Sequence, residues 1–346
     1  MSLQLFTKRA LVLASRSVVF CPGVERCCIS WRGNPVIVGY HRILPKRQWK
    51  QYPCIHADIA VTPERFRSHM VFWKQYAMPV GMDAIAEGNF PDNAVAIGFD
   101  DFYPEVAEYA IPILEELNIP AILYICTNFA DGDAFLWWYG TDAAVNTTDS
   151  LDVHFEDQHF CGSLKSPNQR LTMFRRLNHY CSQLDKRRQR AFLDCLGTTA
   201  HCLRPEALPT WDLVEQLARH PLISIGAHTL DHVPLLGRDA NEVRRQMRES
   251  RTRIEARLGQ PVRHFAYPFG GRAAAAEREY AMAAEEDFAT AVTTEPGVNT
   301  SKQSRHALFR SVILQEHGCV MLRSLHSGWD NILRQMRKNI MIAFRR

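Results

Sequence analysis

The chain has 346 residues, a hydrophobic fraction of 46% and a charged fraction of 23%, which are typical of a globular protein with a full hydrophobic core. Its formal net charge is only +4, so the composition argues against a nucleic-acid-binding protein. No run reaches the roughly 20 apolar residues that are needed to span a bilayer.

Basic residues concentrate at the two ends of the chain. Lysine and arginine outnumber acidic residues within residues 1–32 and again within 323–346. Such ends either contact an anionic membrane surface or are simply solvated. Arg16 interrupts the N-terminal apolar stretch, which disfavours an exported signal peptide and favours an amphipathic surface helix. The 10 cysteines form no C-x-x-C pair, so we expect reduced thiols and a cytoplasmic protein, in peripheral contact with the inner membrane if the ends bind it.

Strand-like apolar runs alternate with helical patterns along most of the chain. Helices are expected over 63–77, after the capping residue Thr62, over 104–117, and over 240–258, before Gly259. Strands alternating with helices imply parallel pairing, and seven or eight such units predict a closed or nearly closed (β/α) barrel. The predicted strands cover residues 36–40, 78–81, 94–99, 121–126, 222–227, 264–267, 288–293 and 309–314.

Residues 131–208 interrupt this alternation with polar, charged and aromatic pieces and with a basic helix-like run over 169–196. An insertion between two barrel units usually forms a lid or a substrate wall. Its neighbouring tryptophans, Trp137 and Trp138, either stack on sugar rings or pack against the barrel. The predicted organisation is a basic amphipathic N-terminal segment over 1–35, a barrel domain over 36–320 and a basic amphipathic tail over 321–346.

Two acidic residues and two histidines stand where predicted strands end. Asp100 and Asp101 follow the third predicted strand, and His228 and His232 follow the fifth. Either pair alone is compatible with a structural role, as turn acids or as exposed histidines at a helix start. The carboxyl ends of parallel strands share one face, however, so the two pairs are expected to meet. One carboxylate and two imidazoles make a three-ligand metal site with an open position, and the second carboxylate is then available as a base.

Three short motifs around these residues carry a family resemblance. Phe99-Asp100-Asp101, His228-Thr229-x-x-His232 and Phe265-Ala266-Tyr267-Pro268-Phe269-Gly270 resemble, in this order, motifs of the polysaccharide deacetylase family (NodB homology, carbohydrate esterase family 4). The resemblance implies a deformed (β/α) barrel of seven or eight units with an insertion between strands. It also implies that Asp101, His228 and His232 hold a divalent ion and that Asp100 is the general base. Zn²⁺ suits such a set best, and Co²⁺, Ni²⁺ and Fe²⁺ also fit it.

Two further pieces extend the resemblance over about residues 36–316. Val38-Gly39-Tyr40-His41-Arg42 resembles the strand that opens one branch of the family, and Leu308-Phe309-Arg310 resembles a piece near the domain's end. We expect His41, at the end of the first strand, to protonate the departing amine. Its alternative is a buried core histidine. Arg310 is expected to supply the positive charge that holds Asp100.

Three departures from the family pattern concern the rest of the site. Phe102 stands where the family usually has glycine, Ala266 stands in place of an arginine, and the late Leu-x-His motif that supplies a general acid is not evident. Because Pro268 has no N–H, the backbone N–H of Phe269 is the expected oxyanion donor. The other expected substrate contacts are Tyr267, Trp137 and Trp138.

These patterns predict a metal-dependent hydrolase that acts on a linear amide. The expected reaction removes acetyl from an N-acetylated sugar in a cell-surface glycan or its lipid-linked precursor, and the tryptophans of the insertion favour a sugar. One alternative is a deacylase of a small non-sugar amide. Another is a catalytically silent glycan-binding scaffold, which Phe102 and the missing arginine leave open.

Overall fold

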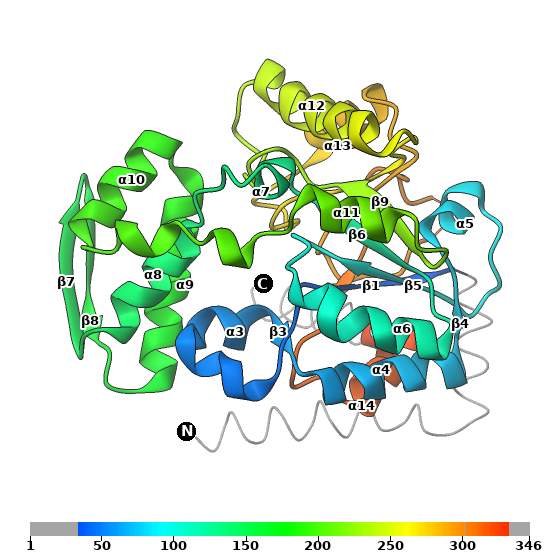
Figure 1. Ribbon diagram of the computed structural model, residues 1–346, viewed down its shortest axis with the longest axis horizontal. Coiled ribbons are helices and arrows are strands. Elements are labelled where there is room, and N and C mark those ends of the chain that lie inside the picture. The colour runs from blue at the N-terminus through cyan, green and yellow to red at the C-terminus, as the bar shows by residue number, and fades with distance from the viewer. Residues whose placement is uncertain (1–33, 301, 332–346) are drawn as a thin grey trace, which may run out of the picture.

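The computed structural model of the protein describes residues 34–300 and 302–331. The predictions for the basic ends, as far as they concern residues 1–33 and 332–346, lie outside the described residues. One curved parallel sheet with helices around it forms a deformed (β/α) barrel, which confirms the predicted fold class (Figure 1). None of the helices in the described part of the chain is long and apolar enough to cross a membrane.

Each of the eight predicted strands contains a strand of the barrel sheet. Seven lie in the order β11-β10-β9-β6-β5-β1-β12, and β4 pairs with β5. Leu308 pairs with Val292, and Ser311 pairs with Val38, so the chain between Leu308 and Ser311 connects the two ends of this order. The strands are β1 (Val36–Tyr40), β4 (Met78–Pro79), β5 (Ala94–Phe99), β6 (Ala121–Ile125), β9 (Ile223–Ala227), β10 (His264–Ala266), β11 (Thr290–Val292) and β12 (Ser311–Val312).

Helices cover the outside of the sheet on both sides (Figure 1). The α4 helix begins as its sequence predicts, because the Thr62 side chain accepts a hydrogen bond from the Arg65 N–H and Pro63 occupies the first position. The barrel helices are α4 (Pro63–Tyr76), α5 (Met82–Glu87), η3 (Val106–Ala110), α6 (Ile111–Leu117), α7 (Thr127–Ala130), α11 (Trp211–Ala218), α12 (Ala240–Leu258), α13 (Glu277–Glu285) and α14 (Cys319–His326).

The two faces of the strands contribute to different parts of the core. Alternate residues such as Val38 and Ile97 pack outward in the main hydrophobic cluster that the helices cover. The inward positions include glycines. A Cβ on Gly39 would lie 3.2 Å from the Arg310 side chain, and one on Gly226 would lie 2.6 Å from the Tyr124 ring. These glycines therefore leave room inside the barrel for two large polar side chains.

The insertion forms a lobe beside the barrel, with a hairpin at its outer edge (Figure 1). It has its own hydrophobic cluster, which also includes Cys54 and Ile55 from a segment before the first barrel helix. The predicted helix-like run is two helices, because Asp185 caps a second helix by accepting a hydrogen bond from the Arg188 N–H. The elements are β2 (Arg42–Ile43), η2 (Lys46–Gln51), α3 (Pro53–Ile59) and β3 (Ala60–Val61) before the lobe, and α8 (Trp137–Asn146), β7 (Ser150–Phe155), β8 (Gln158–Ser163), α9 (Pro167–Gln183), α10 (Lys186–Cys195), η4 (Thr199–Cys202) and η5 (Pro205–Ala207) within it.

The helix α14 crosses the predicted boundary between the barrel domain and the tail. Leu322 and Leu325 are buried in the main hydrophobic cluster, and the helix packs against α4. The barrel domain therefore extends at least to His326, six residues further than the predicted boundary at residue 320.

Candidate active site

The predicted site residues meet at the carboxyl ends of three strands. Asp100 and Asp101 follow β5, His228 begins the loop after β9, and His41 follows β1 directly. The strands are parallel, so these ends share one edge of the sheet. Backbone hydrogen bonding between β1 and β5 continues past the end of both strands, because the Asp100 N–H donates to the Tyr40 carbonyl at 2.9 Å.

Asp101, His228 and His232 form a compact buried cluster. Asp101 Oδ1 lies 3.0 Å from His232 Nε2 and 3.5 Å from His228 Nε2. One donor atom from each residue lies within 4.8 Å of the others. Asp101 Oδ1 and His232 Nδ1 are buried without a hydrogen bond of good geometry. Such atoms are costly to bury unless a further partner satisfies them.

The cluster fits a divalent metal ion. The Nδ1 atom of His228 lies 2.7 Å from the Ala266 carbonyl, which leaves the Nε2 lone pair directed at the cluster. Two imidazoles and one carboxylate provide three protein ligands, and a position remains for substrate or water. Asp101, His228 and His232 would therefore hold the ion.

Asp100 is bound by a buried arginine. Arg310 Nη1 and Nη2 each donate to one Asp100 carboxylate oxygen at 2.6 Å, and Arg310 Nε donates to the Thr293 carbonyl at 3.1 Å. The arginine side chain is 0% exposed. Gly39 provides space beside it inside the barrel. This bidentate geometry fixes the orientation of the Asp100 carboxylate and stabilises its negative charge.

The charges around the two carboxylates keep both ionised. Burial alone would raise the pKa of Asp100, but Arg310, together with His228 and His41, lowers this pKa below its usual value. Burial also opposes ionisation of Asp101, and the neighbouring His232 and His228 hold its pKa well below the ordinary range. The two acids thus have different partners, a guanidinium for Asp100 and two imidazoles for Asp101.

His41 lies beside Asp100 at the mouth of the site. Its Nε2 atom is 3.8 Å from Asp100 Oδ2, and its side chain is 17% exposed. Its Nδ1 atom is buried and has no hydrogen-bond partner. Burial lowers the pKa of His41, and Asp100 and Asp101 offset this only in part. His41 is therefore neither a core histidine nor a member of the metal cluster.

A cavity of 150 Å³ opens over His41, Asp101 and His232. The barrel, the α3 segment and the lobe all contribute to its walls, so the insertion does supply a wall of the site. The lining residues are His41, Asp101, Tyr103, His232 and Phe269 from the barrel, Ile55, Asp58 and Ile59 from α3, and Trp138, Phe174 and Asn178 from the lobe. The α3 residues were not predicted from the sequence, because they belong to none of the motifs and their place at the cavity depends on packing against the lobe.

Comparison with protein families identifies the chain. A family model described as Polysaccharide deacetylase matches residues 87–285, more than half of the sequence. The chain belongs to the polysaccharide deacetylase family. This deacetylase carries the buried metal-type cluster and Asp100 within the matched range, whereas His41 and Arg310 lie outside it.

Solved deacetylase structures share the fold. The Streptococcus pyogenes deacetylase PplD, in complex with acetate, has a TM-score of 0.56 at 16% identity, over 85% of this chain and 98% of that chain. IcaB from Ammonifex degensii has a TM-score of 0.55 at 15% identity, over 85% and 97%. A de-N-acetylase from Aggregatibacter actinomycetemcomitans has a TM-score of 0.53 at 14% identity, over 84% and 99%. Comparison with curated proteins found no match.

Phe269, the predicted oxyanion donor, lines the cavity of this deacetylase. Its side chain is 39% exposed. Its backbone N–H donates to no acceptor among the described residues. Trp137 stacks on the Phe269 ring, with the ring centroids 6.4 Å apart. Trp137 and Trp138 are both buried in the lobe, so packing is their main contact, and only Trp138 reaches the cavity wall.

Tyr267 was predicted to contact the substrate, and this prediction is wrong. Its ring is fully buried against Phe265 and Tyr280, and its hydroxyl donates to the His306 carbonyl at 2.7 Å. The Tyr267 N–H pairs with the Val292 carbonyl at 3.2 Å. Tyr267 continues the outward-facing side of β10, because alternation along the strand directs its side chain away from the cavity.

Backbone strain is concentrated at the site. Five of the eight non-glycine residues with positive φ in the described ranges are Asp101, Phe102, Thr229, His232 and Phe269. Each such residue costs about 1–3 kcal/mol and persists only where its surroundings enforce it. Phe102, at φ 49°, adopts a conformation that glycine accepts without strain, which explains the usual glycine at this position.

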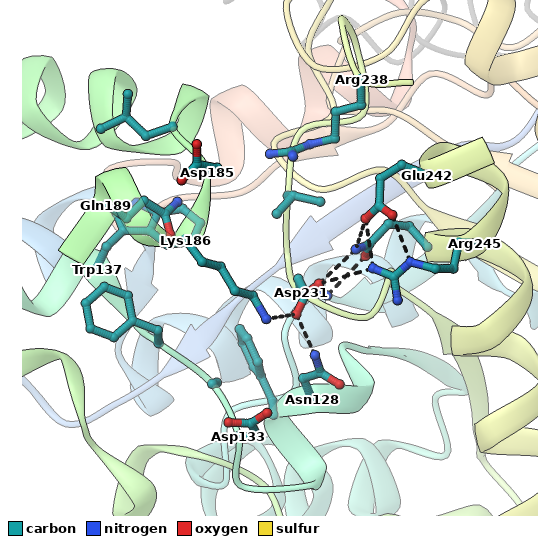
Figure 2. A pocket seen from close by; sticks show the side chains of 16 residues that line it. Asn128, Asp133, Trp137, Asp185, Lys186, Gln189, Asp231, Arg238, Glu242 and Arg245 are labelled. Carbon is teal, nitrogen blue, oxygen red and sulfur yellow. Dashed lines mark hydrogen bonds and ion pairs between the residues drawn. The ribbon is translucent and has the colours of Figure 1, made fainter. Parts of the chain in front are cut away.

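A second cavity, of 290 Å³, surrounds Asp231 (Figure 2). Trp137 lines it and also stacks on Phe269 of the first cavity. Its polar centre is Asp231, which accepts hydrogen bonds from the side-chain amides of Asn128 and Gln246.

Asp231 also connects the lobe to the loop that carries His232. Lys186 Nζ, at the start of α10, lies 2.7 Å from Asp231 Oδ1 (Figure 2). The Gln246 side-chain oxygen accepts the Asp231 N–H at 3.2 Å. The sequence prediction missed this role, since a single acid between two histidines gives no signal of its partners.

Proposed function

We propose that this carbohydrate deacetylase is a metal-dependent N-deacetylase. Its substrate would be an acetamido sugar in a cell-surface glycan or in a lipid-linked precursor. The observation that carries the proposal is the buried Asp101–His228–His232 cluster, which lines the cavity through Asp101 and His232, next to an arginine-bound Asp100. A carboxylate held ionised next to a metal-type cluster is the arrangement that amide hydrolysis by water requires.

The chemical roles follow from the partners of each residue. A divalent ion held by the cluster would act as a Lewis acid toward the acetamide carbonyl and would make water more acidic. Asp100 accepts the proton of the attacking water, because Arg310 keeps it ionised and oriented. The Phe269 N–H donates to the oxygen that becomes negative in the transition state.

His41 delivers a proton to the departing amine in this proposal. It is the imidazole at the cavity that stands outside the metal cluster, and it lies within 3.8 Å of Asp100, which holds the proton taken from water. Since burial lowers the pKa of His41, the imidazole transfers a proton during the reaction and does not store one beforehand. The variant His41→Ala should lose turnover and keep its metal content. Unchanged turnover would contradict this role.

The substrate class is supported by the cavity and by one structural neighbour. Aromatic rings from the barrel and the lobe wall the cavity, as expected for a sugar ring. The structure of PplD was solved with acetate, the acid that an acetamido group would release.

The test is acetate release from a panel of substrates. The panel contains acetylated glycans, lipid-linked and nucleotide-linked acetamido sugars, and small non-sugar amides, with Asp100→Asn as the inactive control. The proposal expects release from sugars only. Release only from the non-sugar amides would indicate a different deacylase, and a folded, metal-free protein without any release would indicate a binding scaffold.

The basic ends of the chain bear on where in the cell the enzyme acts. We propose a cytoplasmic enzyme whose basic ends contact the inner membrane surface, on the basis of their charge. Removal of residues 332–346 should shift the protein to the soluble fraction and leave α14 intact. An unchanged distribution would contradict the contact of that end.

A further inference from the structure

The β7–β8 hairpin of the lobe has one packed and one exposed face. Its strands pair with Asp152 opposite Cys161 and with His154 opposite His159. Residues of the other face, such as Leu151 and Phe160, are buried in the lobe's hydrophobic cluster. The four paired residues are all exposed, so none of them is needed for packing.

The side chains of this exposed face are arranged close together. The imidazoles of His154 and His159 stack with their centroids 3.8 Å apart and their planes 10° apart. His159 Nε2 lies 2.7 Å from Asp152 Oδ1. Donor atoms of Asp152, His154 and His159 lie within 4.8 Å of one another.

This set has the chemistry of a zinc site. Imidazole nitrogen, carboxylate oxygen and thiolate sulfur are the protein ligands of Zn²⁺, and four of them complete a tetrahedral site. Residues directly opposite in an antiparallel pair have Cβ atoms about 4.5–5.5 Å apart, so a rotation about χ1 brings the Cys161 sulfur toward Asp152. A neutral imidazole nitrogen has a lone pair that it can offer to a metal ion.

We propose that the exposed face of the β7–β8 hairpin binds one zinc ion through Asp152, His154, His159 and Cys161. The ion joins the two strands of a hairpin that lies at the outer edge of the lobe, away from the barrel (Figure 1). The site is thus separate from the Asp101 cluster in residues and in place, and it does not depend on the proposed function.

Metal counting with matched variants tests this site. Protein freed of any histidine tag is stripped with a chelator, loaded with Zn²⁺, desalted and analysed by mass spectrometry for zinc per chain. The wild type should hold two ions, and both His159→Ala and His228→Ala should hold one. His201→Ala, which removes another exposed histidine of the lobe, should hold two. Circular dichroism confirms that each variant is folded.

The outcomes separate the two sites. Loss of one ion in His159→Ala with unchanged deacetylase activity supports the hairpin site, and equal zinc content in His159→Ala and the wild type would overturn it. Co²⁺ loading tests the fourth ligand. A thiolate-to-cobalt absorption band that disappears in Cys161→Ser is expected, and its absence in the wild type would overturn the assignment of Cys161.

Discussion

The barrel and the lobe use their side chains in different ways. In the barrel, strand ends and inward glycines position charged groups, and Asp100, Asp101 and Arg310 are all buried, with Arg310 bound to Asp100. The lobe buries apolar residues in a core of its own and contributes apolar and amide groups to the cavity wall. Changes in the barrel's charged set should therefore abolish chemistry, whereas changes in the lobe should alter stability or substrate fit.

Among the changes that distinguish the barrel from the lobe, substitution of Arg310 in the barrel is expected to have the largest effect on stability. Arg310→Met removes the partner of Asp100 and leaves a buried charge, which should lower the free energy of unfolding by about 3–5 kcal/mol and abolish acetate release. Arg310→Lys keeps the positive charge but not the bidentate geometry, so it should retain more stability and more acetate release than Arg310→Met. Urea unfolding and acetate release measure these effects. An active, fully stable Arg310→Met would contradict the role given to this pair.

A histidine in the barrel should give a pH dependence of stability. Burial lowers the pKa of His69 to about 4, and the His317 carbonyl opposes this only in part. The unfolded chain, with a pKa near the usual value of about 6.5, therefore binds the proton first. Stability from His69 is complete above about pH 6.5 and is lost toward pH 4, on the order of 3 kcal/mol. In urea unfolding, the free energy of unfolding of His69→Gln should depend less on pH in this window than that of the wild type. The same pH dependence in both proteins would contradict the role of His69.

The lobe should show the opposite dependence through Asp142. Burial raises the pKa of this carboxyl to about 6, although it accepts the N–H groups of Cys54 and Ile55. The folded state binds the proton first, so stability is greatest below about pH 4 and falls toward pH 6, on the order of 3 kcal/mol. Asp142→Asn should gain stability relative to the wild type across this window. Urea unfolding measures this difference. The same dependence of the free energy of unfolding on pH in both proteins would contradict the role of Asp142.

The smallest effect is expected where the lobe meets the barrel at Asp231. Lys186 is 60% exposed, and Asp231 keeps its amide partners without it. Lys186→Met should change the free energy of unfolding by only about 0–1 kcal/mol. Arg187→Met, a change of the neighbouring exposed cation, is the control. A much larger loss in Lys186→Met alone would show that this contact holds the lobe in place.

The two regions also differ in how far the sequence predicts them. All barrel strands were predicted, because apolar runs between turn signals are a local pattern, and the strand-end rule placed Asp100 and the His228 pair on one face. Tyr267 was assigned to the wrong side of β10, since a motif does not show which way each side chain points.

In the lobe, local patterns carried less information. The β7–β8 hairpin has polar residues on its exposed face and a turn at Glu156 and Asp157, which a search for apolar runs overlooks. The joint core with α3 depends on contacts between segments that are distant along the chain, such as Asp142 with Cys54, 88 residues apart. Neither feature follows from periodicity.

The most direct test of the central claim is acetate release from an acetylated glycan substrate before and after metal removal. The wild type should lose activity on chelation and regain it with Zn²⁺. Asp101→Asn should lack the catalytic metal and stay inactive, and Asp100→Asn should bind the metal yet lose activity by about 10²–10⁴-fold, as expected for a general base. Full acetate release by wild-type protein shown to be metal-free, or by Asp100→Asn, would contradict the account.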